Sequence, residues 1–275
     1  MIGTARIVAL VALWAAALAS PRAEALNADA AGNEAAQRTV RLCYNEQLGP
    51  PDGEHFSLQL IRALAAVTPT ARFELRALPW MRCLVLVSRG DMDAILGASF
   101  TPERGMDLVY PRDARGRPDE SLRLFVQGYR LLRRRGDALD FDGERFRRLV
   151  GPIGVERGHS SAVLARERGA AVDDSHPDVH SMLAKLRGGR VGGILVAEPR
   201  YATLRREPGL LDGVEAVPTA LARRPYFLVF SRAFSQREPH LMGALWRDAA
   251  RLRETPAIRQ ATAEQQGMIV EGEGS

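Results

Sequence analysis

Alternating apolar and polar positions begin the ordered part of the chain and then give way to helical spacing. Residues 39–44 alternate as a strand does, whereas apolar residues within 56–67 recur every three or four positions, as on one face of a helix. The two patterns repeat in 71–78 and 79–90, and a short apolar strand follows at 93–97. This order predicts a mostly parallel α/β sheet with right-handed crossovers.

A second series of strands and helices follows residue 120. A long strand over 121–132 is predicted to carry the chain into a second lobe, and the apolar run 225–230 predicts a strand that returns to the first. Helices over 239–253 and 256–266 finish the chain. Between the two crossings the pattern predicts further strands and helices at 150–155, 161–168, 170–172, 178–187, 191–197, 198 onward and 214–217.

The predicted fold is therefore an α/β clamp of two lobes. Each lobe is expected to be a mostly parallel sheet flanked by helices, with the two crossover strands as the hinge. Lobe 1 is predicted to be discontinuous, with residues 39–122 plus 227–275, and lobe 2 to cover residues 123–226.

Basic and acidic residues are interleaved within 133–148. Arginines at 133–135, 145, 147 and 148 stand close to acids at 137, 140, 142 and 144. Such mixing predicts a solvated loop and helix rather than a site for an anionic polymer.

The first 25 residues have a pattern of their own. A short basic segment, 1–6, precedes a wholly apolar run, 7–18, and Ala23-Glu24-Ala25 forms a small-x-small cleavage site. This predicts a cleaved secretory signal peptide over 1–25, a loose leader over 26–38 and a periplasmic location. The alternative, a membrane anchor, needs about 20 apolar residues, and this run is shorter. We expect no membrane insertion after cleavage.

The charge balance is mildly basic. The chain has 38 Lys and Arg against 33 Asp and Glu, a net charge of +5, and Lys185 is its one lysine. Loss of residues 1–25 would remove Arg6, Arg22 and Glu24 and lower the net charge to +4. Because the arginines are spread along the whole length, we expect no nucleic-acid partner.

Two cysteines, Cys43 and Cys83, follow the predicted signal peptide. In an oxidising compartment a disulfide is the first hypothesis, closing a loop of about 40 residues. Two separate buried thiols are the alternative. The first predicted strand and the helix that carries Cys83 should be near neighbours, which favours the bridge.

Residues 90–104 join a helix end to a strand and then to another helix start. Gly90 ends the helix, and Thr101-Pro102-Glu103 is typical of a helix N-terminus, with Thr as N-cap and Pro in the first position. Ligands of open α/β sheets sit beyond the carboxyl ends of the strands. Ser99, Thr101 and Arg104 therefore fall where a small molecule would be held.

Several motifs together resemble the periplasmic solute-binding proteins that serve polar amino acid ABC transporters, the family 3 extracellular solute-binding proteins. The resemblance covers about residues 40–267 and implies a two-lobed, periplasmic-binding-protein-like clamp of type II. Its motifs are Leu78-Pro79-Trp80-x-Arg82-Cys83, Gly90-Asp91-Met92-Asp93-Ala94, Ser99-Phe100-Thr101-Pro102-Glu103-Arg104, Tyr110-Pro111, the loop 154–160, which is similar to the family's second-lobe anion loop, and the segment 183–199.

This resemblance implies a receptor rather than an enzyme. We expect a monomer that closes around a small carboxylate-bearing solute, an amino acid or a related compound, and delivers it to an ABC transporter permease. One alternative is a periplasmic sensory or partner-docking protein of the same fold. Another is a dehydratase-like enzyme on the same scaffold, with Glu198 as a general acid.

Arg104 is the candidate for the ligand carboxylate, because a guanidinium can form two parallel charge-assisted hydrogen bonds with it. Ser99 and Thr101 would supply hydroxyl groups or act only as turn formers. Ser160 and Ser161 precede a predicted helix, where backbone N–H groups favour an anion; a simple N-cap would look the same in sequence.

The residues that could contact the rest of the ligand follow the family's pattern less closely. Tyr44 and Trp80 are expected near the same rim, where they would stack on the ligand or pack in the core. The resembled family has an Asp where this chain has Ala197. Glu198 and Glu46 are substitute acids, although Glu198 should point to the opposite side of the strand. With Ala197 in this position, the sequence does not require the ligand to be an α-amino acid.

The sequence offers no pattern typical of a metal or cofactor site. The five histidines have no metal-ligand spacing with the cysteines, and a Gly-x-Ser-x-Gly elbow is absent. We expect neither a metal nor a cofactor.

Overall fold

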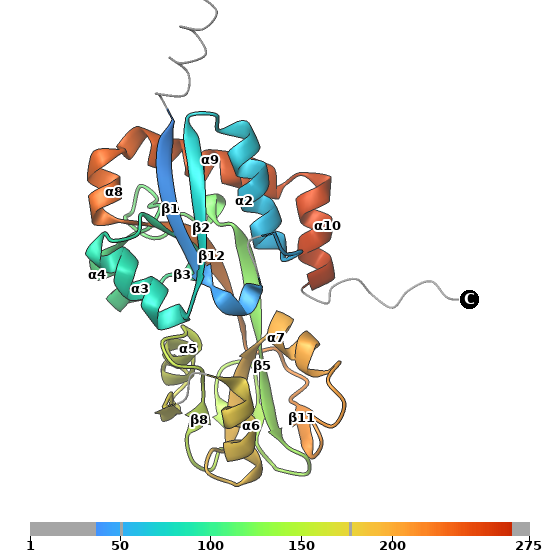
Figure 1. The fold of residues 1–275 in the computed structure, drawn as a ribbon. Helices are drawn as coiled ribbons and strands as arrows, with labels where there is room; N and C mark the ends of the chain where they lie inside the picture. The colour runs from blue at the N-terminus through green and yellow to red at the C-terminus, as the bar shows by residue number, and fades with distance from the viewer. Residues whose placement is uncertain (1–36, 50–51, 176–177, 266–275) are drawn as a thin grey trace, which may run out of the picture. The chain divides into compact units, whose positions relative to one another are not determined.

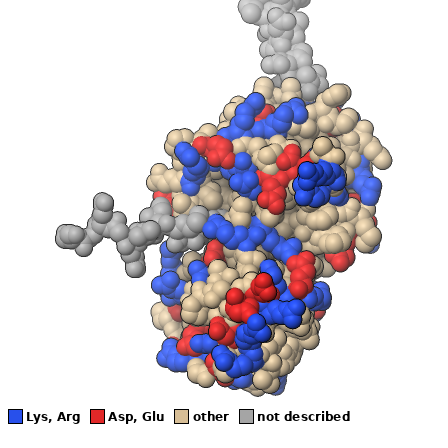
Figure 2. All heavy atoms as spheres, turned by 180° about the vertical axis from the view of Figure 1, so that it is seen from behind, with Lys and Arg blue, Asp and Glu red and all other residues tan. Residues whose placement is uncertain are grey.

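The computed structural model describes residues 37–49, 52–175 and 178–265. The predicted signal peptide, 1–25, and nearly all of the predicted leader lie outside the described residues. Within the described part of the chain, no helix is long and apolar enough to cross a membrane. On the face shown in Figure 2, basic and acidic side chains occur together over most of the surface.

The first three long strands form the parallel unit that the sequence predicts. β1 (Arg38–Asn45) lies between β2 (Ala71–Leu78) and β3 (Ala94–Ser99) and pairs in parallel with both. Their crossovers are α2 (Phe56–Val67) and α3 (Trp80–Arg89). Gly90, in the left-handed conformation at φ 83°, ends α3 and lets the chain turn into β3.

A single sheet of ten strands continues from this unit, in the order β2-β1-β3-β12-β5-β10-β8-β9, with β4 and β11 paired at its sides. β12 pairs antiparallel with both β3 and β5, and these two long strands join the upper and lower elements in Figure 1. The remaining strands are β4 (Leu108–Val109), β5 (Phe125–Arg134), β8 (Ile153–Gly154), β9 (Val172–Asp173), β10 (Gly193–Ala197), β11 (Val214–Ala216) and β12 (Ala222–Ser231).

Helices flank the sheet, most of them where the sequence predicts them. The exception is α8, a single short segment that begins at its N-cap Ser231 and buries Phe234. The remaining helices are α4 (Pro102–Asp107), α5 (Ser161–Glu167), α6 (Val179–Arg187), α7 (Glu198–Leu204), α8 (Arg232–Arg237), α9 (Pro239–Arg253) and α10 (Pro256–Gln265), with the short 3-10 turns η1 (Glu46–Leu48) and η2 (Glu120–Leu122).

Four hydrophobic cores lie in two groups along the sheet. What we call the first region contains β1–β4 with α2–α4 and α8–α10, and it has one core on each face of the sheet. The second region contains β6 (Asp140–Phe141), β7 (Phe146–Arg147) and β8–β11 with α5–α7, and it too has two cores. β5 belongs to both, because Phe125 packs in a core of the first region and Leu131 in a core of the second.

The segment with interleaved charges folds as a hairpin, and the predicted helix there is wrong. β6 (Asp140–Phe141) pairs antiparallel with β7 (Phe146–Arg147). Gly143 adopts φ 102°, and Asp142 Oδ1 accepts hydrogen bonds from the backbone N of residues 144 and 145 at 2.9 and 2.8 Å. An Asp-Gly turn of this kind selects a hairpin over a helix.

The predicted disulfide is confirmed. Cys43 in β1 and Cys83 in α3 are bonded, with their Cα atoms 5.7 Å apart, and both are fully buried. The alternative of two separate thiols is therefore wrong. A bridge that closes a loop of this length stabilises a fold by about 2–4 kcal/mol.

Asp93 is a second tie within the first region, with 2% of its side chain exposed. Arg41 donates to both of its oxygens, at 3.0 and 3.1 Å, and Arg237 donates to Oδ1 at 2.9 Å. Burial alone would raise the pKa of Asp93, but the hydrogen bonds from the two arginines outweigh it and lower the pKa below its usual value. Asp93 therefore links β1 and α8 to the start of β3.

Candidate functional site

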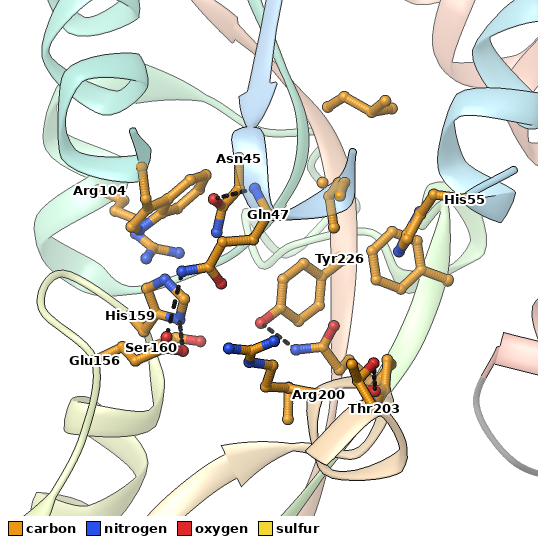
Figure 3. A pocket seen from close by; sticks show the side chains of 18 residues that line it. Asn45, Gln47, His55, Arg104, Glu156, His159, Ser160, Arg200, Thr203 and Tyr226 are labelled. Carbon is orange, nitrogen blue, oxygen red and sulfur yellow. Dashed lines mark hydrogen bonds and ion pairs between the residues drawn. The ribbon is translucent and has the colours of Figure 1, made fainter. Parts of the chain in front are cut away.

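A cavity of about 220 Å³ lies where the first and second regions meet. It is at the carboxyl ends of β1 and β3, and the side chains of both regions point into it (Figure 3). The residues that line it are Asn45, Gln47, Leu48, His55, Trp80, Leu96, Gly97, Arg104, Phe125, Gln127, Glu156, His159, Ser160, Ala197, Pro199, Arg200, Thr203 and Tyr226.

Arg104 is held in position by the backbone. Thr101 caps α4 by accepting a hydrogen bond from the backbone N of Arg104, at 3.2 Å. The guanidinium donates to the carbonyl and hydroxyl oxygens of Ser99, at 2.8 and 3.3 Å, and to the carbonyl of Gly158, at 2.7 Å. A guanidinium has five N–H donors, so these three hydrogen bonds leave donors for a ligand.

Trp80 supports the same guanidinium from the first turn of α3. The Arg104 guanidinium carbon lies 5.1 Å from the centre of the Trp80 ring, within the range of a cation–π contact. Trp80 Nε1 donates to the carbonyl of Gly158 at 3.0 Å. Gly158 has φ 72°, and a Cβ there would come 2.1 Å from the sulfur of Met81. The positive φ favours glycine at this position, where the two regions approach each other.

Glu156 and His159 form the opposite wall. Gln47 Nε2 donates to Glu156 Oε1 at 3.4 Å, and His159 Nδ1 lies 3.5 Å from Glu156 Oε2. Burial raises the pKa of Glu156. Burial and the charge of Arg104 lower the pKa of His159 to about 4, so this imidazole is neutral at pH 7.

Arg200 enters the cavity from α7 and carries the second guanidinium of its lining. In Figure 3 its guanidinium points toward Glu156 and away from the body of α7. Among the residues that the structure describes, its buried Nε has no hydrogen-bond partner. The positive charge of Arg200 acts on Glu156 and opposes the rise in its pKa.

Hydroxyl groups from the two crossing strands form a hydrogen-bonded network beside the cavity. The Tyr129 hydroxyl lies 2.6 Å from that of Tyr226 and 3.0 Å from Ser160 Oγ, and Gln127 Nε2 donates to the Tyr226 hydroxyl at 3.1 Å. Burial raises the pKa of Tyr129 well above its ordinary value. This network is uncharged and ties β5, β12 and the start of α5 together beside the cavity.

Comparison with known proteins identifies the fold. The chain matches no protein-family model and no curated protein. It is similar to the structure of a histidine kinase sensor domain with similarity to periplasmic binding proteins, at a TM-score of 0.64 and 17% identity over 85% of this chain and 98% of that one. The chain has the periplasmic-binding-protein fold. The fold class predicted from the sequence is confirmed.

Two further similar structures are of binding proteins. One is a binding component of an ABC transporter from Wolinella succinogenes complexed with lysine, with a TM-score of 0.58 and 14% identity over 82% of this chain and 94% of that one. The other is an ancestral amino acid-binding protein, a precursor of cyclohexadienyl dehydratase, with a TM-score of 0.57 and 17% identity over 82% and 95% of the two chains. Most of the similar structures are binding proteins.

Five of the residues predicted for the site lie in or directly behind the cavity. Arg104, Trp80 and Ser160 line it. Ser99 and Thr101 are buried and act on Arg104, Ser99 as an acceptor for its guanidinium and Thr101 as the cap of its helix. The Ser160 side chain makes no capping hydrogen bond, because its hydroxyl faces Tyr129 instead.

The other four predicted residues are not among those that line the cavity. Tyr44 is buried in a core of the first region, where its hydroxyl donates to the carbonyl of Gly49 at 3.0 Å. Ser161 is buried at the start of α5, and Glu46 is exposed in η1. Glu198 lies over Gly128 of β5, with Oε1 3.4 Å from Arg130 Nε. Glu198 is the first residue of α7 rather than part of β10, so the alternation of strand residues does not determine its direction.

Several lining residues were not predicted. Glu156 and His159 lie within residues 154–160, the loop that is similar to the family's second-lobe anion loop. Their position in the sequence could therefore have indicated a place in the site. Arg200 follows Glu198 by two residues, but the sequence does not show which side of the short α7 faces the cavity. His55 caps α2 through Nδ1, 3.3 Å from the backbone N of Ser57, and burial lowers its pKa to about 4.

The site has no arrangement typical of a metal centre. Within the ranges that the structure describes, no group of three or more His, Cys, Asp or Glu side chains could hold a metal ion. The lining offers guanidinium, amide and hydroxyl donors, which suit an anionic organic ligand.

Proposed function

We propose that the protein is a periplasmic receptor that closes around a small carboxylate-bearing solute and presents it for ABC-type uptake. The observation that carries the proposal is Arg104, whose guanidinium is fixed by Ser99, Gly158 and Trp80 at the wall of a cavity shared by two regions. A pre-positioned guanidinium binds a carboxylate with little loss of side-chain entropy. The cavity is smaller than the roughly 300–1,000 Å³ of pockets for drug-sized ligands, which favours a small solute.

Opening and closing would occur between lobe 1, residues 39–122 plus 227–275, and lobe 2, residues 123–226. β5 and β12 would be the hinge, because they are the long strands that run between the two regions. The carbonyl of Gly158 accepts hydrogen bonds from Trp80 and Arg104 at 3.0 and 2.7 Å. These contacts would form on closure and place the ligand-binding arginine at the same time.

The proposed setting follows from the fold and from the N-terminal sequence. Similar structures include binding proteins of ABC transporters. A signal peptide over 1–25 would direct the chain to the periplasm, where the cleaved protein would act as a monomer with a transporter permease as its partner.

Thermal unfolding of the mature protein with a panel of amino acids and small carboxylic acids tests this function. A ligand present at 100 times its dissociation constant adds about 2.7 kcal/mol of stability, which should raise the midpoint by several degrees. Arg104→Ala should abolish the shift, whereas Arg72→Ala, at an exposed position on β2, should retain it. An equal shift in Arg104→Ala would refute the proposed role of the arginine.

A sensory protein that docks to a partner is the second candidate, and the similarity to a histidine kinase sensor domain favours it. It would bind its solute in the same cavity, so solute binding alone does not separate it from uptake. Deletion of the gene should abolish accumulation of the radiolabelled solute by cells if the protein serves a transporter, and should leave accumulation unchanged if it serves only as a sensor.

A dehydratase-like enzyme is the third candidate, supported by the similarity to a dehydratase precursor. Its expected general acid, Glu198, pairs with Arg130 and does not line the cavity. Formation of product from cyclic prephenate-like acids would establish this activity, and their unchanged recovery would exclude it for these substrates.

A further inference from the structure

We infer that the solute is a small dicarboxylate without an amino group, with one carboxylate on Arg104 and the other on Arg200. This inference rests on the proposed function and names the class of solute. The inference depends on both guanidinium groups together, because they line the same small cavity.

The charges of the lining favour a dianion. Arg104 and Arg200 contribute two positive charges, and among the described lining residues Glu156 is the one carboxyl group. The net charge is thus positive whether Glu156 is ionised or protonated. His55 and His159 add nothing at neutral pH, because burial lowers the pKa of each to about 4. A zwitterion would leave this charge uncompensated, and a cationic ligand would increase it.

The two guanidinium groups stand on different walls. Arg104 belongs to α4 of the first region and Arg200 to α7 of the second. Arg200 lines the cavity, and its guanidinium points toward Glu156 (Figure 3). A second carboxylate would bind to this guanidinium only with both walls in place.

The second-region wall offers few groups that could bind an ammonium group. Ala197, at the end of β10, presents a methyl group to the cavity, and the neighbouring Glu198 is turned away toward Arg130. Glu156 is already shared by Gln47 and His159. The lining also includes apolar side chains, Leu48, Leu96 and Phe125, which suit the methylene groups of a short chain.

Isothermal titration calorimetry at pH 7 with five compounds tests the inference. Succinate and glutarate carry two carboxylates, butyrate carries one, glutamate adds an ammonium group, and lysine is cationic. We expect one of the two dicarboxylates to bind at least 10-fold more tightly than the other three compounds. Tighter binding of glutamate or lysine would overturn the inference but leave the proposed function standing. Absence of binding by all five would count against both.

Arg200→Gln separates the contribution of the second carboxylate. A hydrogen-bonded charge pair of this kind is worth about a 10- to 100-fold change in affinity. Arg200→Gln should weaken dicarboxylate binding by that factor and leave butyrate binding within about twofold, whereas Arg206→Gln, at an exposed position just beyond α7, should change neither. Unchanged dicarboxylate affinity in Arg200→Gln would contradict the inference.

Glu156→Gln is a second test, because an increase or a decrease in ligand affinity distinguishes a ligand without an ammonium group from one that has it. If the ligand has no ammonium group, removal of a nearby negative charge should leave dicarboxylate affinity unchanged or raise it by up to about 10-fold. If Glu156 instead binds an ammonium group, the same variant should lose affinity by at least 10-fold. Far-UV circular dichroism of each variant confirms that these effects arise in a folded protein.

Discussion

The two walls of the cavity are built in different ways. On the first-region wall, Arg104 makes three hydrogen bonds to Ser99 and Gly158 and lies over Trp80. On the second-region wall, Arg200 has a buried Nε with no hydrogen-bond partner among the described residues. If the proposed function is correct, the first wall would fix where a carboxylate binds and the second wall would determine which carboxylates bind well.

The same contrast extends to the stability of the two regions. The first region contains the Cys43–Cys83 disulfide and the buried Asp93 with its two arginines. Since the chain has two cysteines, the second region has no disulfide. The second region has hydrophobic cores and ion pairs whose acids are more exposed than Asp93, such as Arg133 with Glu215 at 2.8 Å. The disulfide and the Asp93 contacts stabilise the region that holds Arg104, which is consistent with a pre-positioned guanidinium.

The largest expected effect is loss of the disulfide. The double variant Cys43→Ser, Cys83→Ser should lower the free energy of unfolding by about 2–4 kcal/mol, because the unfolded chain is no longer constrained. Chemical denaturation measures the loss, and hydrogen exchange locates it. Protection should fall more in β1 and α3 than in α5 and α6. Equal loss in both regions would contradict the contrast between them.

Removal of Asp93 should have the next largest effect. Asp93→Asn should destabilise the protein by about 1–3 kcal/mol, a range reduced because both partner arginines are partly exposed. The folded-state pKa of Asp93 is lowered, so its contribution is complete at neutral pH and is lost as the pH falls below about 4.

Chemical denaturation of the wild type and of Asp93→Asn, at pH values from neutral to acid, tests the predicted direction of this pH dependence. The difference between them should be largest near neutral pH and should shrink as the pH falls through the folded-state pKa. Glu120→Gln, at an exposed position in η2 away from Arg41 and Arg237, is a control, and it should show no comparable acid-dependent difference. A difference that grows on acidification would show that the Asp93 network is not stabilising.

Trp80→Phe tests the contact between the two walls. The substitution keeps an aromatic ring near Arg104 but removes the hydrogen bond from Nε1 to the carbonyl of Gly158. One such hydrogen bond is worth about 0.5–1.5 kcal/mol, so solute affinity should fall by roughly 3- to 10-fold with little change in the stability of the protein alone. Unchanged affinity would mean that this contact does not contribute to closure.

Tyr226→Phe should have the smallest effect. It removes a hydroxyl that contacts Gln127 at 3.1 Å and Tyr129 at 2.6 Å, while the ring still stacks on Phe125. We expect a loss of stability of about 0.5–1.5 kcal/mol and a change in affinity of less than about threefold. A much larger loss of affinity would place the Tyr226 hydroxyl in direct contact with the solute.

The sequence predicted the fold better than the site, for a physical reason. The bounds of α2 and β2 follow from local periodicity and agree with the prediction to the residue. The hairpin β6–β7 was missed because an Asp-Gly turn outweighs the helix-forming residues beside it.

Site residues depend on which way each side chain points after packing. Thr101 and Arg104 were predictable because a helix start fixes both. Arg200 and Tyr226 were not, since their direction is set by how α7 and β12 pack against the rest of the sheet. Tyr44 fits the strand pattern but turns into a core, a choice that alternation alone does not specify.

A crystal structure of the protein with the dicarboxylate that binds most tightly in calorimetry would show whether the two arginines hold the ligand. We expect a ligand in the cavity with one carboxylate oxygen about 2.7–2.9 Å from a guanidinium nitrogen of Arg104, and the second carboxylate at Arg200. A ligand bound outside the cavity, or with no carboxylate in contact with Arg104, would contradict this expectation.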